Sequence, residues 1–258
     1  MHDGLNRAWR VIATGWSFAA FGIGGLALRM IAFPLLTLCV RDPQRRQRLA
    51  RRLIQRSFAF FIRMAQALGV FTYEIEGEEL LRRDGLLVLA NHPTLLDVVF
   101  LIAHLPNAGC VVKSRLARNP FTRGPVQAAG YVCNDSGPGL VADCIAALRS
   151  GSTLVIFPEG TRTRRDGTLQ LQRGAANIAV RGAVDVTPVV LHCDPWTLGK
   201  GEPWYSVPPR RFTYRIEVRD DIPARTFSSP GEGAALAARR LTDLLTEFFQ
   251  REASRAGP

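Results

Sequence analysis

The chain begins with two apolar segments that contain no charged residue, and they limit the folds that it can adopt. Residues 11–28 and 30–40 lack Asp, Glu, Lys and Arg, and only Arg29 separates them. As a helix, the first segment would span about 27 Å at 1.5 Å per residue, close to the roughly 30 Å of a bilayer core. Pro34 would kink a helix through the second segment. We expect residues 11–40 to enter a membrane, by spanning it or by dipping into one leaflet.

Two alternatives compete with a membrane helix. A cleaved signal peptide would follow basic residues such as Arg7 and Arg10, but this apolar stretch is long and a second one follows at once. A buried helix of a soluble domain is the other alternative. Four glycines between residues 15 and 25 weaken a soluble helix there, because glycine costs about 1 kcal/mol relative to alanine. The membrane helix is therefore the leading interpretation.

A strongly basic segment follows the apolar ones. Residues 41–56 contain seven arginines and one acidic residue, Asp42, and the whole chain has a formal net charge of +11. Positive charge beside an apolar segment marks the cytoplasmic side of a membrane and attracts anionic lipid headgroups. A solvated helix face is the simpler alternative. We expect the N-terminal segment to anchor the protein on an anionic membrane surface, at the cytoplasmic face of the inner or plasma membrane.

Two other classes of function fit the sequence poorly. The arginines are not accompanied by a recognisable nucleic-acid-binding motif, so we expect no nucleic-acid partner. The five cysteines are far apart and form no Cys-x-x-Cys pair, so neither a disulfide framework nor a zinc site is expected. A reducing compartment fits this cysteine pattern best.

From Gly69 onward, short apolar segments alternate with helical patterns. Strands that alternate with helices are typical of an α/β fold with a mostly parallel central sheet flanked by helices. We predict an N-terminal membrane-embedded helical hairpin over residues 1–69, followed by an α/β domain over residues 70–258. The predicted strands are residues 71–77, 85–91, 109–113, 152–157, 184–191 and 211–218, and the predicted helices are residues 94–105, 139–149, 172–182 and 233–253.

One predicted strand ends in a polar motif, Asn91-His92-Pro93-Thr94, and Asp97 follows inside the next apolar run. On a continuous helix, His92 and Asp97 would point about 140° apart and could not meet. Pro93 forces the residue before it out of the helical region and suits a helix start, so Asp97 can reach back to the imidazole. Such a carboxylate fixes the histidine tautomer and stabilises the cation, as a general base requires. Alternatively, Asn91 or His92 caps the helix and Asp97 complements its dipole.

Two cationic motifs follow other predicted strands. The string Phe-Pro-Glu-Gly-Thr-Arg, residues 157–162, is followed by two more arginines and by Arg173. A glycine turn followed by arginines, at the carboxyl end of a strand, is suited to holding a phosphate. Lys113 stands at the end of another predicted strand. Each motif alone is weak, since Pro-Glu-Gly turns are common and a lone lysine is usually a surface residue.

Together these motifs resemble the glycerophospholipid acyltransferase family, the group that includes 1-acylglycerol-3-phosphate acyltransferase. The resemblance covers residues 70–195 and consists of four blocks in the family's order. They are Asn91-His-Pro-Thr-Leu-Leu-Asp97, Lys113-Ser-Arg-Leu116 with Pro120 and Gly124, Phe157-Pro-Glu-Gly-Thr-Arg162, and Val186-Thr-Pro-Val-Val190 after Arg173-Gly174. The first block matches the family's His-x4-Asp motif, and the resemblance makes residues 70–258 the acyltransferase catalytic domain.

The resemblance implies that His92 is the general base that deprotonates an acceptor hydroxyl and that Asp97 orients it. The acyl donor would be a thioester of coenzyme A (acyl-CoA) or of acyl carrier protein (acyl-ACP), with no metal and no other cofactor. The acceptor would be a lysophospholipid such as 1-acyl-glycerol-3-phosphate, with its phosphate gripped by Arg162 and Lys113. The full predicted substrate site consists of Asn91, Lys113, Glu159, Gly160, Thr161 and Arg162. The family's N-terminal hydrophobic helices embed in one leaflet.

One position departs from the family pattern. Family members often carry an Ile-Asp-Arg-like sequence after the second block, and here Ser136 stands where the arginine is expected. The acceptor phosphate would then be held more weakly, or the acceptor would be a different lipid, such as an amino-acid lipid. A non-catalytic lipid-binding module is a further alternative, although binding alone requires neither His92 nor Asp97.

Overall fold

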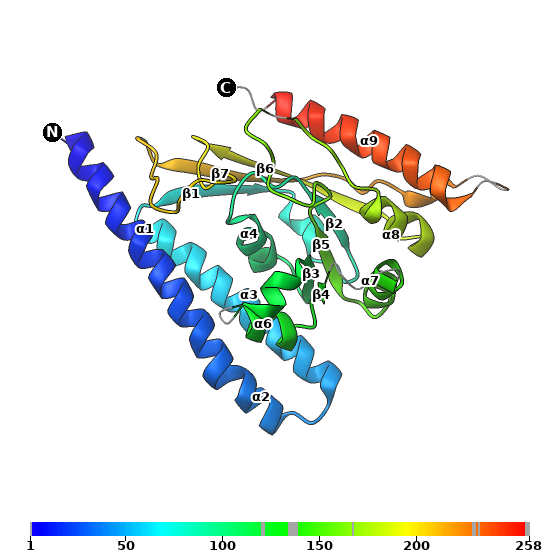
Figure 1. Ribbon diagram of the computed structural model, residues 1–258, viewed down its shortest axis with the longest axis horizontal. Coiled ribbons are helices and arrows are strands. Elements are labelled where there is room, and N and C mark those ends of the chain that lie inside the picture. Colours follow the sequence, from blue (N-terminus) through cyan, green and yellow to red (C-terminus); the bar gives the residue numbers. More distant parts are fainter. Residues whose placement is uncertain are drawn as a thin grey trace.

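A central β-sheet organises the computed structural model, which describes residues 2–119, 122–133, 139–166, 168–228, 231 and 233–255. Its strands in these residues are β1 (Phe71–Glu76), β2 (Leu87–Ala90), β3 (Ala108–Val112), β4 (Val132–Cys133), β5 (Thr153–Ile156), β6 (Val186–Asp194) and β7 (Phe212–Val218). Their order in the sheet is β1-β7-β6-β2-β5-β3-β4 (Figure 1). Neighbours are parallel except β6 and β7, which are antiparallel. The predicted mostly parallel α/β sheet is confirmed.

Helices cover both faces of this sheet. They are α3 (Pro43–Ala67), α4 (Asp97–His104), α5 (Ser114–Arg118), α6 (Arg123–Ala128), α7 (Leu140–Arg149), α8 (Gly174–Gly182) and α9 (Ala234–Arg255), with short 3₁₀ helices η2 (Glu78–Leu81) and η4 (Ala224–Phe227). In β2, Val88 and Ala90 belong to the core shared with α3 and α4, whereas Leu87 and Leu89 belong to the core shared with α7, α8 and α9. A strand that is apolar on both sides is typical of a parallel sheet between two helical layers.

The N-terminal apolar segments form one continuous rod. The helix α1 (His2–Ala27), the π-helical segment η1 (Leu28–Ala32) and the helix α2 (Phe33–Cys39) follow one another without a break. Pro34 has no N–H to donate, and its ring crowds the carbonyl four residues earlier. The chain accommodates it with a wider turn just before it, in which the N–H of Phe33 donates to the carbonyl of Leu28.

The helix α3 returns beside the rod and completes a helical hairpin (Figure 1). Asp42 caps its first turn, because its carboxylate accepts hydrogen bonds from two backbone N–H groups. On the inner side of α3, Ile54, Phe61 and Ile62 are buried in the same core as strands β1 and β7. The hairpin is therefore joined to the sheet by apolar packing along α3.

The outer face of the rod is apolar and exposed. The segment Gly4–Cys39 is long and apolar enough to cross a membrane, judged by length and composition. The large apolar side chains exposed along it are Leu5, Trp9, Val11, Ile12, Trp16, Ile23, Leu26, Met30, Ile31, Leu35 and Leu38. A stripe of this kind is typical of a surface that contacts lipid or another protein.

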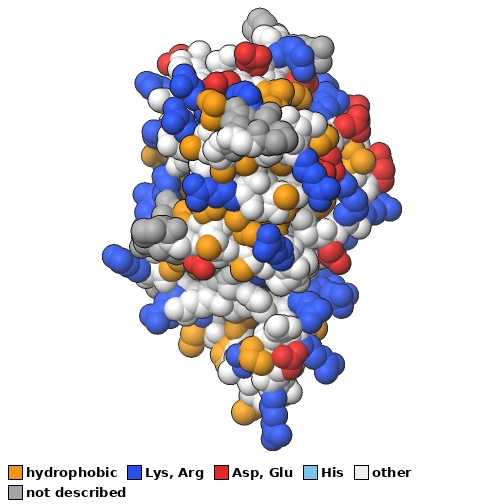
Figure 2. All heavy atoms as spheres, turned by 90° about the vertical axis from the view of Figure 1, so that its right-hand side faces the viewer, with side chains coloured by type: hydrophobic (Ala, Val, Ile, Leu, Met, Phe, Trp, Pro, Cys, Tyr) orange, Lys and Arg blue, Asp and Glu red, His pale blue; other side chains and the backbone are white. Residues whose placement is uncertain are grey.

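Positive charge is spread over the surface. Lys and Arg side chains are distributed across the face seen in Figure 2, with few Asp and Glu side chains between them. The tip formed by the turn between α2 and α3, at the bottom of Figures 1 and 2, carries both basic and apolar groups. On α3, Arg45, Arg48 and Arg52 are exposed.

Arg51 differs from its neighbours in the basic segment, because it is buried, with an exposed fraction of 4%. Its Nε donates to the carbonyl of Ala129 at 2.8 Å. Its Nη1 donates to Oδ1 of Asn107 at 3.0 Å and to Oγ of Ser152 at 2.7 Å. The guanidinium thus ties α3 to three separate segments of the α/β domain.

Replacing Arg51 with alanine should lower the thermal stability, because Oδ1 of Asn107 and Oγ of Ser152 then lose a donor, while the carbonyl of Ala129 keeps the one from Gln47. At about 1–3 kcal/mol for buried groups left unpaired, the melting temperature should fall by roughly 2–12 °C. Arg52→Ala removes the same charge from an exposed position on the same helix. This variant should shift the melting temperature by less than about 2 °C. Thermal unfolding in detergent measures both variants, and equal shifts would contradict the tethering role of Arg51.

Candidate active site

The carboxyl ends of three neighbouring strands meet at one edge of the sheet. The strands β2, β5 and β3 are adjacent and parallel, and they lead into His92, Glu159 and Lys113 respectively. Leu89 of β2 pairs with Ile156 of β5, so His92 and Glu159, each three residues further on, stand at the same level. Ligands of open α/β sheets bind outside this edge.

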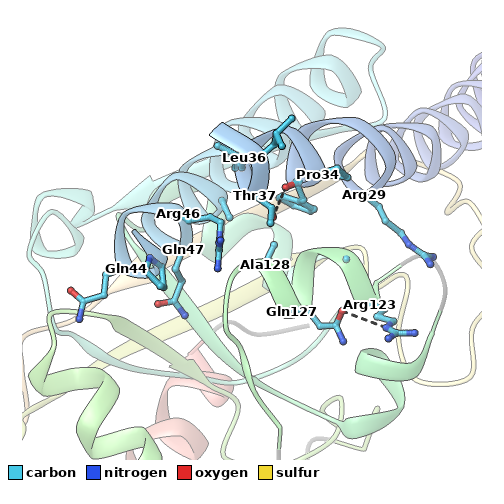
Figure 3. A pocket seen from close by; sticks show the side chains of 15 residues that line it. Arg29, Pro34, Leu36, Thr37, Gln44, Arg46, Gln47, Arg123, Gln127 and Ala128 are labelled. Atoms are coloured by element: carbon cyan, nitrogen blue, oxygen red, sulfur yellow. Dashed lines mark hydrogen bonds between the residues drawn. The ribbon is translucent and has the colours of Figure 1, made fainter. Parts of the chain in front are cut away.

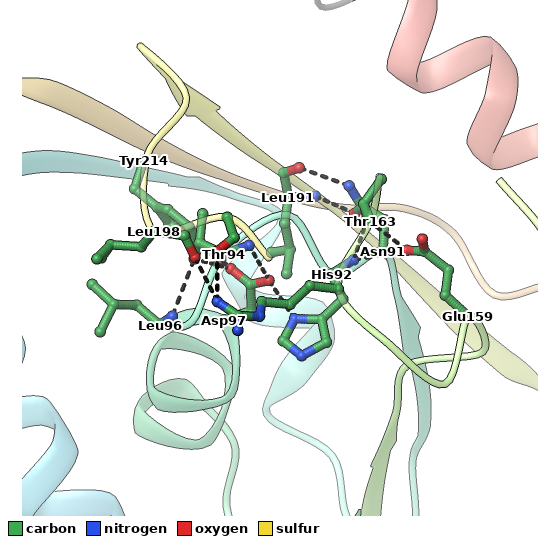
Figure 4. Close-up of polar contacts among 12 residues, drawn as sticks. Asn91, His92, Thr94, Leu96, Asp97, Glu159, Thr163, Leu191, Leu198 and Tyr214 are labelled. Carbon is green, nitrogen blue, oxygen red and sulfur yellow. Dashed lines mark hydrogen bonds and ion pairs between the residues drawn. The ribbon is translucent and has the colours of Figure 1, made fainter. Parts of the chain in front are cut away.

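The expected contact between His92 and Asp97 is present. Nδ1 of His92 lies 2.6 Å from Oδ2 of Asp97 (Figure 4). The helix α4 begins at Asp97, three residues later than the sequence predicted, because Thr94 starts a turn in which its hydroxyl accepts from the N–H of Leu96. Pro93 and this turn bring the carboxylate back over the imidazole.

The contact with Asp97 decides which nitrogen of His92 is basic. A carboxylate only accepts hydrogen bonds, so Nδ1 carries the proton and Nε2 keeps a lone pair. The side chain of His92 is 18% exposed, whereas that of Asp97 is fully buried. On one side the imidazole stacks on Phe157, with ring centroids 4.1 Å apart. The arrangement suits a general base that meets its substrate through Nε2.

Thr94 and Tyr214 hold the carboxylate of Asp97, and the sequence analysis did not single out either residue for this role. Oδ2 accepts the N–H of Thr94 at 2.8 Å, and Oδ1 accepts the hydroxyl of Thr94 and, at 2.7 Å, that of Tyr214. Burial, followed by the charge of Asp97, raises the pKa of Tyr214 well above its usual value, so the phenol stays protonated and donates. Tyr214 lies on β7, more than a hundred residues from the motif, and no local pattern marks it.

Glu159 contacts the backbone of the catalytic motif. Its Oε1 accepts the N–H of His92 at 3.0 Å and the hydroxyl of Thr163 at 2.6 Å. Thr163 also donates its own N–H to the carbonyl of His92 at 2.7 Å. Burial raises the pKa of Glu159, while these hydrogen bonds act in the opposite direction. Glu159 and Thr163 therefore fix His92 through its main chain, a role that the sequence analysis did not foresee.

Asn91 is also engaged with the backbone. Its amide donates to the carbonyl of Leu191 at 2.8 Å and accepts the N–H of Leu191 at 2.7 Å, which extends the pairing of β2 with β6 beyond the end of β2. The residue thus fixes the strand end from which His92 emerges. This geometry favours a structural role over the predicted substrate contact.

Arg162 holds the loop that follows β6. Its Nη1 donates to the carbonyls of Leu198 and Gly199, at 3.0 and 2.8 Å. The N–H of Leu95, two residues before Asp97, donates to the same Leu198 carbonyl at 3.0 Å. The loop is therefore attached both to the Glu-Gly-Thr-Arg turn and to the start of α4.

The other predicted substrate residues lie around the same edge. Gly160 is exposed, and its φ of +66° is the left-handed conformation that favours glycine in a turn. Thr161 beside it is half-buried, and Lys113 is exposed at the start of α5. Ser136, where the family pattern has arginine, lies outside the described residues, as does Pro120.

An apolar cavity of about 430 Å³ lies between the hairpin and the α/β domain. Its walls come from α1, α3, α4 and α6 and include Phe21, Phe58 and Val126. Val98, the residue after Asp97, also lines it. A cavity of this size and character fits a long hydrocarbon chain better than a polar ligand.

Known proteins resemble this chain in sequence. The family model described as Acyltransferase matches residues 72–192. A putative 1-acyl-sn-glycerol-3-phosphate acyltransferase of Caenorhabditis elegans, acl-2, is 29% identical over 221 residues, which are 78% of this chain and 74% of that protein. The 1-acyl-sn-glycerol-3-phosphate acyltransferase of Helicobacter pylori is 32% identical over 112 residues, 41% of this chain and 47% of that protein. The alpha enzyme of the same name from Bos taurus is 30% identical, with 66% of this chain and 59% of that protein aligned.

A solved structure shares the fold along almost the whole chain. The 1-acyl-sn-glycerophosphate acyltransferase PlsC from Thermotoga maritima superimposes with a TM-score of 0.66 at 19% identity, covering 96% of this chain and 99% of that one. The sequence alignments span between about half and three quarters of the length of the curated relatives above. The family model over residues 72–192, these relatives and the common fold together support the glycerophospholipid acyltransferase family for this chain.

Proposed function

We propose that this acyltransferase transfers a fatty acyl chain from an acyl thioester to the free hydroxyl of 1-acyl-glycerol-3-phosphate or a close lysophospholipid. The observation that carries the proposal is the 2.6 Å contact between His92 and the fully buried Asp97 at the sheet edge. The names of the relatives support this acceptor, because several are 1-acyl-sn-glycerol-3-phosphate acyltransferases. The donor would be acyl-CoA or acyl-ACP.

His92 would act as a general base and then as a general acid. Nε2 removes the proton of the acceptor hydroxyl as the oxygen attacks the thioester carbonyl carbon. The new C–O bond forms, the C–S bond breaks, and the imidazolium returns the proton to the leaving thiolate. Asp97 keeps the proton of Nδ1 in place and stabilises the imidazolium between the two steps. Base catalysis of this kind contributes roughly 10²–10⁴ in rate.

Two cations near the sheet edge would hold the acceptor phosphate. Lys113 is exposed at the end of β3, and Arg162 projects from the turn after β5. Since Nη1 of Arg162 is bonded to loop carbonyls, its other guanidinium nitrogens would contact the phosphate. The fixed position that these carbonyls give to Arg162 would limit where the acceptor hydroxyl lies relative to His92.

The cavity of about 430 Å³ would receive an acyl chain, and the rod formed by α1, η1 and α2 would bring the protein to its lipid substrates. The exposed apolar stripe of the rod supports insertion into a membrane, and the exposed arginines on α3 favour the anionic cytoplasmic side. The cavity lies between the rod and the catalytic domain, so a chain could pass from the bilayer into it.

Replacing His92 with alanine should reduce kcat by roughly 10²–10⁴, because the base is lost. The assay supplies labelled acyl-CoA and acyl-ACP donors with a panel of lysophospholipids and amino-acid lipids. His104→Ala removes an imidazole from the other end of α4 and should leave kcat within about twofold. An unchanged kcat in the His92 variant would refute the assigned base, and transfer to another lipid alone would replace the proposed acceptor.

Tyr214→Phe should lower kcat about tenfold with little change in KM, because Asp97 loses one donor and holds the imidazole less firmly. Tyr73→Phe is the matched control, since Tyr73 packs on the same Phe100 ring as Tyr214. Equal kcat values for both variants, or a loss that appears in KM alone, would contradict a positioning role for Tyr214.

Placing aspartate at Ile12 and Ile23 should weaken vesicle binding at least tenfold, because each new charge faces the proposed bilayer side of the rod. Ile12 and Ile23 are both exposed in the parent protein, so the fold should tolerate both substitutions. Leu236→Asp introduces the same charge at an exposed apolar position of α9, on the opposite helical layer, and should have little effect. Flotation with vesicles of phosphatidylcholine and phosphatidylglycerol measures binding, and equal losses for all variants would count against this anchor.

A further inference from the structure

A second, larger cavity lies away from the catalytic dyad. It has a volume of about 1060 Å³ and is bordered by η1 and α2, by the first turns of α3, and by α6 (Figure 3). The helix α6 separates it from the apolar cavity, because Pro125 and Val126 line the apolar cavity whereas Arg123 and Gln127 line the larger one. The proposed reaction does not use this space.

Three arginines from three different elements border the larger cavity: Arg29 of η1, Arg46 of α3 and Arg123 of α6. None of the described residues that line it is Asp or Glu. Guanidinium groups are weakly hydrated and bind phosphate oxygens through two parallel hydrogen bonds. The charge of the cavity therefore fits a phosphate group.

The backbone around Arg29 is shaped to bring its side chain over α6. Arg29 lies in the π-helical segment that precedes Pro34. Its aliphatic stem passes so close to Gly124 that a Cβ atom there would lie 2.8 Å from Cγ and 2.9 Å from Cβ of Arg29. Only glycine leaves room for this contact. Irregular π turns of this kind are frequent at functional sites.

The other wall of the cavity is apolar. Phe33, Leu36 and Leu38 of α2 line it, and the outer surface of the same rod carries the exposed Ile31 and Leu35. A small soluble anion would leave this apolar wall in contact with water. A phosphate joined to hydrocarbon chains would satisfy the arginines and the apolar wall together.

We propose that this cavity binds one anionic phospholipid of the surrounding leaflet, separately from the substrates. Its headgroup phosphate is held by Arg29, Arg46 and Arg123, and its acyl chains follow α2 into the bilayer. The bound lipid joins the rod, α3 and α6 at one point and so steadies the α6 wall of the apolar cavity. The inference rests on the proposed membrane association but not on the assigned base.

The test measures lipid binding directly, without activity. The full-length protein in a neutral detergent is titrated with fluorescent dioleoyl phosphatidylglycerol, and native mass spectrometry counts the bound lipids. We expect one saturable site for this lipid. Dioleoyl phosphatidylcholine, inorganic phosphate and coenzyme A should displace the fluorescent lipid from it at least tenfold less well than unlabelled phosphatidylglycerol does. Equal displacement by phosphatidylcholine would overturn the anionic specificity, and equal displacement by phosphate or coenzyme A would assign the cavity to a soluble anion.

Charge-matched variants separate the cavity from the general basic surface. The double variant Arg46→Gln/Arg123→Gln should weaken phosphatidylglycerol binding at least tenfold. Arg45→Gln/Arg48→Gln removes the same charge from exposed positions on α3 outside the cavity and should change binding less than twofold. Equal weakening by both pairs would show diffuse attraction and overturn the proposal.

Two further variants test the construction of the site and its independence from catalysis. Gly124→Ala should favour α6 as a helix but push the stem of Arg29 aside, and so weaken binding severalfold. Unchanged binding in this variant would contradict the role of Arg29. His92→Ala should bind the lipid as the parent does, so failure of the proposed chemistry and failure of the lipid site give different results.

Discussion

The buried carboxylate of Asp97 is the constraint on which the site depends. A carboxylate removed from water is costly unless its oxygens are hydrogen-bonded. Here they accept from the N–H and hydroxyl of Thr94, from the hydroxyl of Tyr214 and from Nδ1 of His92. These donors come from the turn after β2 and from β7, so the folded sheet must be complete before the charge is satisfied. The orientation of the His92 imidazole therefore depends on the folding of the sheet.

Several motif residues hold the main chain around His92 in place. Glu159 and Thr163 are bonded to the backbone of His92, and Asn91 is bonded to the backbone of Leu191. A main chain fixed on both sides leaves the imidazole little freedom beyond its own two torsions, and the stacked ring of Phe157 restricts these further. The proposed role of His92 as a base would benefit from this preorganisation, because the side chain then needs little rearrangement when the proton moves.

The sequence predicted the parts of this structure that depend on local pattern. Apolar runs located six strands of the sheet, and Pro93 predicted the corner that brings Asp97 to His92. The strand β4 and the helices α5 and α6 are too short to produce a periodic signal. Tyr214 and the burial of Arg51 depend on partners about a hundred residues away, and no spacing within one segment reports such contacts. The features that the sequence did not predict are therefore the shortest elements and the long-range hydrogen bonds.

The π turn before Pro34 has a consequence for the outer surface of the rod. Exposed apolar residues at 16, 23 and 30 follow a repeat of seven, and those at 31 and 38 follow the same repeat one position later. One extra residue in a helical turn rotates all later residues by about 100° around the axis. The one-residue shift of the repeat offsets the rotation that the wider turn introduces. The exposed apolar residues therefore continue along one side of the rod past the π turn. The π turn before Pro34 is thus matched by a one-residue shift in the amino-acid pattern, and the exposed apolar side of the rod stays continuous.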